Sequence, residues 1–404
     1  MVWSVNANFT TFKRRVTTNF MKYFLSAGEA SGDIHGAPLM RALRKADPEA
    51  EFVFLGGDDM TAAAAESAPG AAPLIHYRDM AFMAFSEVLR HLGKIFGNLK
   101  TAKKAIADLR PDALILIDYP SFNLKLAKFA HSMGIPVYYY ISPKVWAWKE
   151  WRVKDIRRWC RRVLSILPFE EEYFRGKGME VEYVGNPSVE EIEHREAALP
   201  SRDDFVRTHG LDPNKPILAL VPGSRRGEIR NNLPIMTDVA ARFPQLQAVV
   251  AGAPAIEPGF YRQYSALPVV EGATFELMRN AACALVTSGT ATLECALLGT
   301  PEVVCYRANG SRLSYNIMKH LIKCPWVSLP NLIAGKEIVP EMLVHLCTVD
   351  SVAEKLAAIV PGGPGREDML RGYALMRSRL GHSDAPTRAA ASIVADLKEI
   401  HQKK

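Results

Sequence analysis

The stretch KYFLSAGEASGDIHG, residues 22–36, joins a short apolar run to a loop rich in small residues. Its glycines recur at every fourth position: Gly28, Gly32 and Gly36. An apolar run, a loop with Ser31 or Asp33 as a cap, and a following helix are typical of the carboxyl edge of a parallel sheet, where backbone N–H groups point toward a ligand. The spacing differs from the GxGxxG fingerprint of dinucleotide-binding folds. Two interpretations remain: a loop that binds a ligand, and a turn whose glycines allow close packing. Pro38 predicts that the regular helix begins near Gly36 or kinks there.

Short apolar runs like this one recur along the chain. KYFLSA, EFVFLGG, DALILID, PVYYYIS and EVEYVGN alternate with amphipathic stretches in the first half, and PILALVP, LQAVVAG, LPVVEG, AACALVTSG and PEVVCYR do so in the second. This alternation predicts parallel sheets built from βαβ units. We expect an α/β protein with two Rossmann-like, doubly wound domains that face each other across a cleft.

The polar stretch 186–215 separates the two series of runs. We therefore expect an N-terminal domain at residues 21–187 and a second domain at residues 188–365. The sequence PGGPG at 361–365 precedes a helical segment, 366–404, which we expect to pack back on an N-terminal domain. Residues 1–20 lack the apolar core of a signal peptide and are expected to be a disordered extension.

Composition narrows the class of protein. The chain has 404 residues, of which 48% are hydrophobic and 23% are charged, as in a globular protein with a real core. Its apolar runs are too short to cross a bilayer. The six cysteines form no CxxC and no Cys/His spacing, which indicates a reduced, cytosolic protein without structural zinc.

The formal net charge is +7, and much of the excess lies in residues 149–162, KEWRVKDIRRWCRR, which hold seven basic and two acidic side chains. An excess of this kind favours an anionic partner. Nucleic acid, an anionic membrane surface and a phosphorylated substrate are all compatible with it.

Asp118 ends the buried run ALILID and precedes Tyr-Pro-Ser-Phe-Asn. A carboxylate at the carboxyl end of a parallel strand lies near the ligand crevice and is a candidate general base. The alternative is that Asp118 caps the turn at Pro120.

Two junctions in the second half predict an anion site. In residues 221–229, VPGSRRGEI, Gly223 and Ser224 offer backbone donors, and Arg225 or Arg226 offers a guanidinium fork for a diphosphate; a solvated basic turn is the alternative. In residues 286–296, VTSGTATLECA, small residues would let a phosphate reach a helix N-terminus: Ser288, Gly289 and Thr290. Glu294 follows, either as an acceptor for ribose hydroxyls or as an early-helix acid favoured by the macrodipole.

Residues 80–96, MAFMAFSEVLRHLGKIF, form a broad apolar stripe with lysines nearby, at positions 94, 100, 103 and 104. Burial in a core is the commoner explanation of such a stripe, and an interfacial membrane helix is the alternative. The Asp-x-Asp pair that holds a metal beside a nucleotide diphosphate does not occur in the sequence.

In this order, the motifs resemble those of the lipid-A-disaccharide synthases. The resemblance spans residues 21–395 and is carried by SAGEASGD at 26–33, LIDYPSFN at 116–123, YISPKVWAWKEWRV at 140–153, LPFE at 167–170, PGSRRGEI at 222–229, SGTATLE at 288–294 and SLPNLIAGKEIVPE at 328–341. Two positions depart from the family pattern: Ser121 replaces a second acid, and Asn186 replaces a histidine.

The resemblance implies an inverting, metal-independent glycosyltransferase of the B type without a cofactor. It would condense UDP-2,3-diacylglucosamine with 2,3-diacylglucosamine 1-phosphate into the β-1,6 disaccharide and release UDP. It would act in the cytoplasm as a peripheral protein at the inner face of the inner membrane, on an anionic surface. It would form a homodimer, with the terminal helical segment exchanged between subunits, and bind no nucleic acid.

The resemblance also assigns residues. Asp118 would be the catalytic base. The UDP side would comprise Gly223, Ser224, Arg225, Ser288, Gly289, Thr290, Glu294 and Asn331. The acceptor side would comprise Glu29, Ser31, Asp33, Trp146 and Arg152.

Two other functions compete with this one. A UDP-sugar epimerase on the same fold would need the UDP site but no acyl-binding surface. A non-catalytic module that binds sugar nucleotides or nucleic acid would account for the basic segment alone. UDP release that depends on an acylated, phosphorylated acceptor would exclude both.

Overall fold

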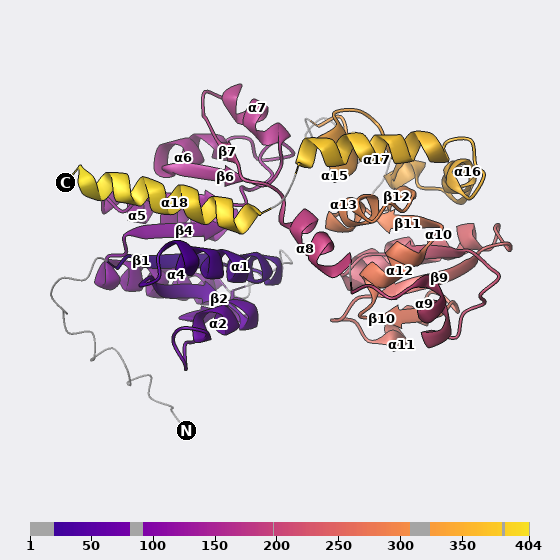
Figure 1. Cartoon of the computed structure of the whole chain (residues 1–404), viewed down its shortest axis with the longest axis horizontal. Coiled ribbons are helices and arrows are strands. Elements are labelled where there is room, and N and C mark those ends of the chain that lie inside the picture. Colours follow the sequence, from indigo (N-terminus) through magenta and orange to yellow (C-terminus); the bar gives the residue numbers. More distant parts are fainter. Residues whose placement is uncertain (1–19, 81–91, 197, 308–323, 382–383, 404) are drawn as a thin grey trace. The chain divides into compact units, whose positions relative to one another are not determined.

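The structure is a computed structural model that describes residues 20–80, 92–196, 198–307, 324–381 and 384–403 (Figure 1). These residues form two β-sheets, one of seven strands and one of six, with helices between the strands. The predicted α/β class is therefore confirmed. The predicted extension at 1–20 lies outside the described residues except for Phe20, as does most of the predicted stripe at 80–96.

The chain divides into two compact units. One contains the described residues within 1–140, 159–162 and 389–404, and the other contains those within 141–158 and 163–388. The first sheet ends with a strand at Glu182–Tyr183 and the second begins with a strand at Ile217–Val221, so the change of sheet falls between these two strands.

The first sheet has the strand order β3-β2-β1-β4-β5-β6-β7. Its strands are β1 Lys22–Ala27, β2 Glu51–Gly56, β3 Ile75–His76, β4 Ala113–Ile117, β5 Val137–Tyr140, β6 Arg162–Ser165 and β7 Glu182–Tyr183. β1 pairs in parallel with both β2 and β4, and Leu25 lies opposite Phe54 on one side and Ile115 on the other. All five residues of β4 are buried, as expected for a central strand covered on both faces.

Helices connect these strands. They are α1 Ala30–Ala46, α2 Asp58–Ala65, a 3₁₀ turn Tyr77–Asp79, α4 Leu92–Leu109, α5 Pro120–Ser132, α6 Arg152–Trp159 and α7 Phe169–Arg175.

The second sheet repeats the topology, with the order β10-β9-β8-β11-β12-β13. Its strands are β8 Ile217–Val221, β9 Gln247–Gly252, β10 Val269–Glu271, β11 Cys283–Thr287, β12 Glu302–Tyr306 and β13 Glu341–Leu343. Its helices are α8 Pro187–Glu196, α9 Arg202–Thr208, α10 Arg226–Ala240, α11 Pro258–Tyr261, α12 Thr274–Asn280, α13 Thr290–Leu297, α15 Leu329–Ala334, a 3₁₀ turn Val344–Leu346, α16 Val349–Ile359 and α17 Arg366–Leu380.

Most of the last helix, α18 Ala385–Gln402, belongs to the first unit, and the helix lies alongside the first sheet (Figure 1). Its buried Asp396 accepts hydrogen bonds from Tyr138 Oη at 2.6 Å, from Arg161 at 2.5 and 2.8 Å and from Arg162 at 3.1 Å. Two cations of the predicted basic segment 149–162 are thus engaged within the chain. No helix among the described residues has both the length and the apolar character that a bilayer crossing requires.

The helix after β1 begins at Ala30, not near Gly36, and includes Pro38. The first of the two alternatives, a start near Gly36, is therefore wrong, because the helix accommodates Pro38 in its interior. The glycines do serve close packing. A Cβ on Gly32 would lie 3.1 Å from the Cβ of Ala27, and one on Gly36 would lie 2.6 Å from the sulfur of Met60.

Candidate active site

Each sheet has one point where the strand order reverses. It lies between β1 and β4 in the first sheet and between β8 and β11 in the second. In open α/β sheets, ligands bind outside the carboxyl ends of the strands at such a point. The loops that follow these four strands start at Gly28, Asp118, Pro222 and Ser288, so they contain four of the motifs singled out in the sequence.

Asp118 directly follows β4 and is half-buried. Its φ is +44° and that of Tyr119 is +46°, so two consecutive residues with side chains adopt the left-handed conformation. Such residues cost about 1–3 kcal/mol each and persist where their surroundings hold them, often at functional sites. The chain thus bends sharply at the end of β4 and leaves Asp118 at the edge of the sheet.

The loop after β1 contacts this bend. A Cβ on Gly28 would lie 2.1 Å from the ring of Tyr119, so only glycine lets the ring cross the backbone there. Tyr119 Oη donates a hydrogen bond to the carbonyl of Met80 at 2.8 Å, and burial together with the nearby charge of Glu29 raises the pKa of Tyr119. Glu29 is half-buried at the start of α1, so the structure brings it close to the Asp118 loop.

The other two acceptor-side candidates on α1 differ. Ser31 is exposed, whereas Asp33 is 2% exposed. The carboxylate of Asp33 accepts hydrogen bonds from the backbone N–H groups of Gly57 at 2.6 Å, Asp59 at 3.0 Å and Met60 at 3.1 Å. It caps the first turn of α2 from a neighbouring helix. This structural use of Asp33 argues against the predicted acceptor contact.

Trp146 is also an internal residue. Its ring is 7% exposed and packs edge-on against Phe169, and its indole N–H donates to Glu170 at 2.9 Å. Ser142 donates to the same carboxylate at 3.1 Å, and Ser165 also hydrogen-bonds to it. Burial raises the pKa of Glu170 to about 7, against the lowering effect of these donors. Trp146 therefore anchors the loop after β5, and the predicted acceptor contact does not agree with its burial.

The exposed tryptophans of this loop are Trp148 and Trp151, at 57% and 61%. Lys149 Nζ lies 4.0 Å from the ring centre of Trp148, and the guanidinium carbon of Arg152 lies 5.5 Å from that of Trp151. Arg152 itself is 7% exposed. The sequence showed that aromatic and basic residues alternate here, but it did not show which of the tryptophans face solvent.

In the second unit, Gly223 has a φ of +111°, and a Cβ there would lie 2.5 Å from a carboxylate oxygen of Glu228. That carboxylate accepts hydrogen bonds from the N–H groups of Ser224 at 3.1 Å and Arg225 at 3.3 Å. Of the two backbone donors predicted to meet a phosphate, Gly223 and Ser224, the N–H of Ser224 is therefore already bound to Glu228. A diphosphate can reach this N–H only if the Glu228 side chain turns away.

The two arginines of this loop are not equivalent. Arg226 makes two hydrogen bonds to Glu257, at 2.8 and 2.6 Å, and lies over the ring of Phe260. The Arg225 side chain is 63% exposed, and within the described part of the chain its ion pair is a 3.4 Å contact with Glu228. Of the two alternatives, Arg225 is the one that can turn toward an anion at lower cost.

The loop after β11 presents Ser288, Gly289 and Thr290 at the start of α13, with Gly289 and Thr290 exposed. Glu294 is half-buried one turn further, and its carboxylate makes no hydrogen bond within the described part of the chain. Burial, followed by the charge of Glu191, raises the pKa of Glu294 to about 7, while Arg195 opposes the shift. A half-buried carboxylate beside a helix N-terminus is suited to accept hydrogen bonds from a ligand.

Asn331 is fully buried and uses all of its polar groups inside the chain. Its Oδ1 accepts from the N–H groups of Ile338 and Val339, at 2.6 and 2.9 Å, and its Nδ2 donates to the Val339 carbonyl and to Glu341, each at 2.9 Å. Asn331 thus holds the loop that leads to β13, which argues against the predicted contact with UDP.

Sequence reasoning missed Asn232 on α10. Its Nδ2 donates to Thr287 Oγ1 at 3.1 Å, and its Oδ1 accepts from the N–H of Arg307 at 2.8 Å, so it fixes the carboxyl ends of β11 and β12. The signal was a polar residue on the buried face of an amphipathic helix. Asn186, which departs from the family pattern, has a similar role, because it bonds to the Ile166 carbonyl and the Ser188 N–H, each at 2.9 Å.

Two Rossmann-like sheets, each with its loops at the switch point, define the B-type glycosyltransferase fold, which UDP-GlcNAc 2-epimerases share. The solved UDP-GlcNAc 2-epimerase from Neisseria meningitidis matches with a TM-score of 0.60 at 14% identity, over 94% of this chain and 100% of that one. A putative UDP-N-acetylglucosamine 2-epimerase from Listeria monocytogenes matches with a TM-score of 0.63 at 12% identity, over 96% and 98%. At these identities the likeness shows the fold alone.

The family follows from sequence comparison. The model of the lipid-A-disaccharide synthetase family matches residues 23–373. The lipid-A-disaccharide synthase of Myxococcus xanthus is 41% identical over 387 residues, 93% of this chain and 98% of that protein. The lipid-A-disaccharide synthase of Acidobacterium capsulatum is 37% identical over 394 residues, which cover 92% of this chain and 95% of that protein. The chain therefore belongs to the lipid-A-disaccharide synthetase family and is a glycosyltransferase of lipid A biosynthesis, so the predicted family is confirmed.

Proposed function

We propose that this enzyme condenses UDP-2,3-diacylglucosamine with 2,3-diacylglucosamine 1-phosphate, with inversion at the anomeric carbon and without a metal. The acceptor 6-hydroxyl attacks the donor C1, its proton passes to the Asp118 carboxylate, and the bond from C1 to UDP breaks with the electron pair on UDP. The observation that carries the assignment is the position of Asp118, half-buried at the switch point of the first sheet.

The leaving group carries negative charge, which fixed positive groups can stabilise. Arg225 and the N–H groups at the start of α13 are placed at the switch point of the second sheet, where a nucleotide is expected. Glu294 would accept hydrogen bonds from the ribose. A UDP-sugar epimerase shares the fold, but family membership favours transfer to an acyl acceptor.

The substitution Asp118→Asn tests the base. It keeps the shape of the side chain, so UDP affinity and thermal stability should stay near those of the unchanged enzyme, while UDP release in the presence of both acylated substrates falls by about 10²–10⁴-fold. Asp112→Asn is the matched control, because Asp112 lies just before β4 and Asp118 just after it, and its Oδ2 accepts a hydrogen bond from the Lys22 N–H. Normal turnover by Asp118→Asn would make Asp118 a cap.

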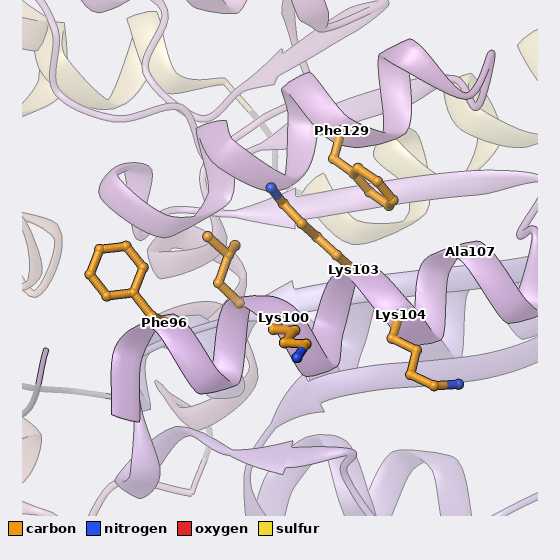
Figure 2. A pocket seen from close by; sticks show the side chains of 7 residues that line it. Phe96, Lys100, Lys103, Lys104, Ala107 and Phe129 are labelled. Carbon is orange, nitrogen blue, oxygen red and sulfur yellow. The ribbon is translucent and has the colours of Figure 1, made fainter. Parts of the chain in front are cut away.

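We also propose that the enzyme works at an anionic membrane surface. Support comes from an open hollow of about 390 Å³ between α4 and α5 (Figure 2). Its lining combines apolar and basic side chains: Phe96, Leu99, Ala107, Phe129, Lys100, Lys103 and Lys104. Phe96 is 59% exposed, and Lys125 Nζ lies 5.5 Å from its ring centre. No described acidic residue pairs with Lys100, Lys103 or Lys125. An apolar floor with unneutralised lysines suits lipid headgroups, where each cation contributes about 1 kcal/mol.

Sedimentation with vesicles that contain anionic lipid tests this surface. Changing Lys100, Lys103 and Lys125 together to Gln should reduce binding by about two orders of magnitude, given about 1 kcal/mol for each cation. The same change at three exposed cations of the second unit, Arg207, Lys355 and Arg371, is the control for net charge. Equal losses in the two variants would mean that total charge alone governs binding.

We propose, finally, that the enzyme is a homodimer in which α18 is exchanged between subunits. α17 lies in the second unit, whereas the chain from residue 389 onward, which is most of α18, belongs to the first, so α18 is the part that would be exchanged. Light scattering should give twice the monomer mass, and truncation after Gly381 should yield monomers or aggregates. A truncated chain that remains an active dimer would contradict exchange.

A further inference from the structure

The backbone at Asp118 and Tyr119 is held in an unfavourable conformation. Both residues carry a Cβ and have φ values of +44° and +46°. Tyr119 also precedes Pro120, and the residue before a proline prefers extended conformations. A bend of this kind persists only if neighbouring groups stabilise it.

Asn123, in the first turn of α5, supplies much of that stabilisation. It is fully buried, and its Nδ2 lies 2.8 Å from the Asp118 carbonyl and 3.2 Å from those of Ile117 and Ser26. Its Oδ1 accepts a hydrogen bond from Ser26 Oγ at 2.7 Å, which fixes the orientation of the amide. One side chain thus ties the ends of β1 and β4 together at the switch point.

Tyr139 supplies a second donor. It is fully buried on β5, and its Oη lies 2.8 Å from the Asp118 carbonyl. The peptide that follows Asp118 is therefore held from two sides, by an amide of α5 and by a hydroxyl of β5. Because the neighbouring Tyr138 instead donates to Asp396, only one of these two adjacent tyrosines acts on the bend.

We infer that Asn123 and Tyr139 are positioning residues for transfer: they fix the left-handed peptide after Asp118 and thereby aim its carboxylate at the acceptor hydroxyl. This inference rests on the proposed role of Asp118 as the base. It extends that proposal to two buried residues that touch no reacting atom. Because small displacements of a catalytic group can cost up to about a hundredfold in rate, loss of either donor should appear in turnover.

The test is a double-mutant cycle between Tyr139→Phe and Asp118→Asn in the full-length enzyme, with Tyr138→Phe as the matched control. Tyr139→Phe should lower kcat about tenfold and leave the KM for the UDP-sugar unchanged. In the Asp118→Asn background it should cause no further loss, because a residue that acts through Asp118 has nothing left to position. Tyr138→Phe removes the same hydroxyl from the adjacent residue and should lower thermal stability while keeping kcat within about twofold.

Ser26→Ala provides a second, milder variant that frees the Asn123 amide to rotate, and it should lower kcat a few-fold with the same dependence on Asp118. An unchanged kcat in Tyr139→Phe, or an equal loss in both backgrounds, would overturn the inference while the proposed base stands. Normal turnover by Asp118→Asn would remove the base and the inference together, so the two failures can be told apart.

Discussion

The ionisation of Glu294 should control UDP affinity. Its pKa is raised to about 7, first by burial and then by the charge of Glu191. A hydrogen bond from a ribose hydroxyl to a carboxylate contributes about 1.5–3 kcal/mol, against about 0.5–1.5 kcal/mol for a neutral acceptor. The difference, about 1–1.5 kcal/mol, corresponds to roughly tenfold in affinity. We therefore expect Glu294→Gln to bind UDP about tenfold more weakly than the unchanged enzyme at pH 8.5.

The sign of the pH dependence follows from the raised pKa. Above pH 7 the carboxyl is ionised and binds the ribose best, and as the pH falls through 7 it takes up a proton and loses that advantage. The affinities of the unchanged enzyme and of Glu294→Gln should therefore converge by pH 5.5. Ligand binding in turn lowers the pKa of Glu294, so UDP should displace a proton near pH 7. Titration calorimetry in buffers of different ionisation enthalpy measures both the affinity and that proton.

Two comparisons make the test decisive. The ionisation of the UDP phosphates affects both proteins equally, so only the difference between their pH profiles reports Glu294. Glu191→Gln should shift the midpoint of that difference to lower pH, because it removes a charge that raises the pKa. Parallel profiles from pH 5.5 to 8.5 would refute the ribose contact and leave Glu294 as an early-helix acid.

Three further predictions concern stability. Glu302 is fully buried, and no described residue hydrogen-bonds to its carboxylate. Burial raises its pKa, so the protein loses stability as the pH rises and this group must ionise. Glu302→Met should therefore raise the free energy of unfolding at pH 8, measured with denaturant, by about 1–3 kcal/mol. Burial acts to raise the pKa of Asp396, but hydrogen bonds and charges that include those of Arg161 lower it on balance, so its contribution to stability is lost as the pH falls. Asp396→Asn should lower the free energy of unfolding by about 2–3 kcal/mol and expose α18 to protease. An unchanged melting temperature would contradict this prediction. Gly28→Ala should lower the free energy of unfolding by about 1–3 kcal/mol, because the new Cβ would overlap the Tyr119 ring. Gly97→Ala is the control: a Cβ there meets no described atom within 4 Å, so it should not destabilise the protein. Equal effects of the two substitutions would contradict the clash at Gly28.

The fold was predictable because its signal is local. Fully buried parallel strands such as Ala113–Ile117 appear in the sequence as uninterrupted apolar runs, and the helices between them show their own period. The carboxyl ends of the strands could then be located, and with them the loops that contain Asp118 and Ser288. Strand order was not readable, because the pairing of β1 with β4 joins residues about ninety positions apart.

Individual roles within the motifs were harder to predict. Asp33, Trp146 and Asn331 stand in motifs with polar character, and the sequence cannot tell whether a polar group meets a ligand or a buried backbone donor. The partners of Asp33 begin at Gly57, on another loop. Asn123, by contrast, shows no functional signal in the sequence, although it stands in the same motif as Asp118. Only the fold brings its amide to three carbonyls.

The two sheets share a topology, but different side chains lie at their switch points. Helix N-termini lie at both and favour anions. In the first sheet the protein's own carboxylates, Glu29 and Asp118, occupy this region, so a nucleotide diphosphate would meet repulsion there. In the second sheet Arg225 is exposed beside small-residue loops, and Glu228 binds the donors that a phosphate would otherwise take. This asymmetry favours a proton acceptor in the first unit and an anion site in the second, which is the division of labour that transfer from a UDP-sugar to a neutral hydroxyl requires.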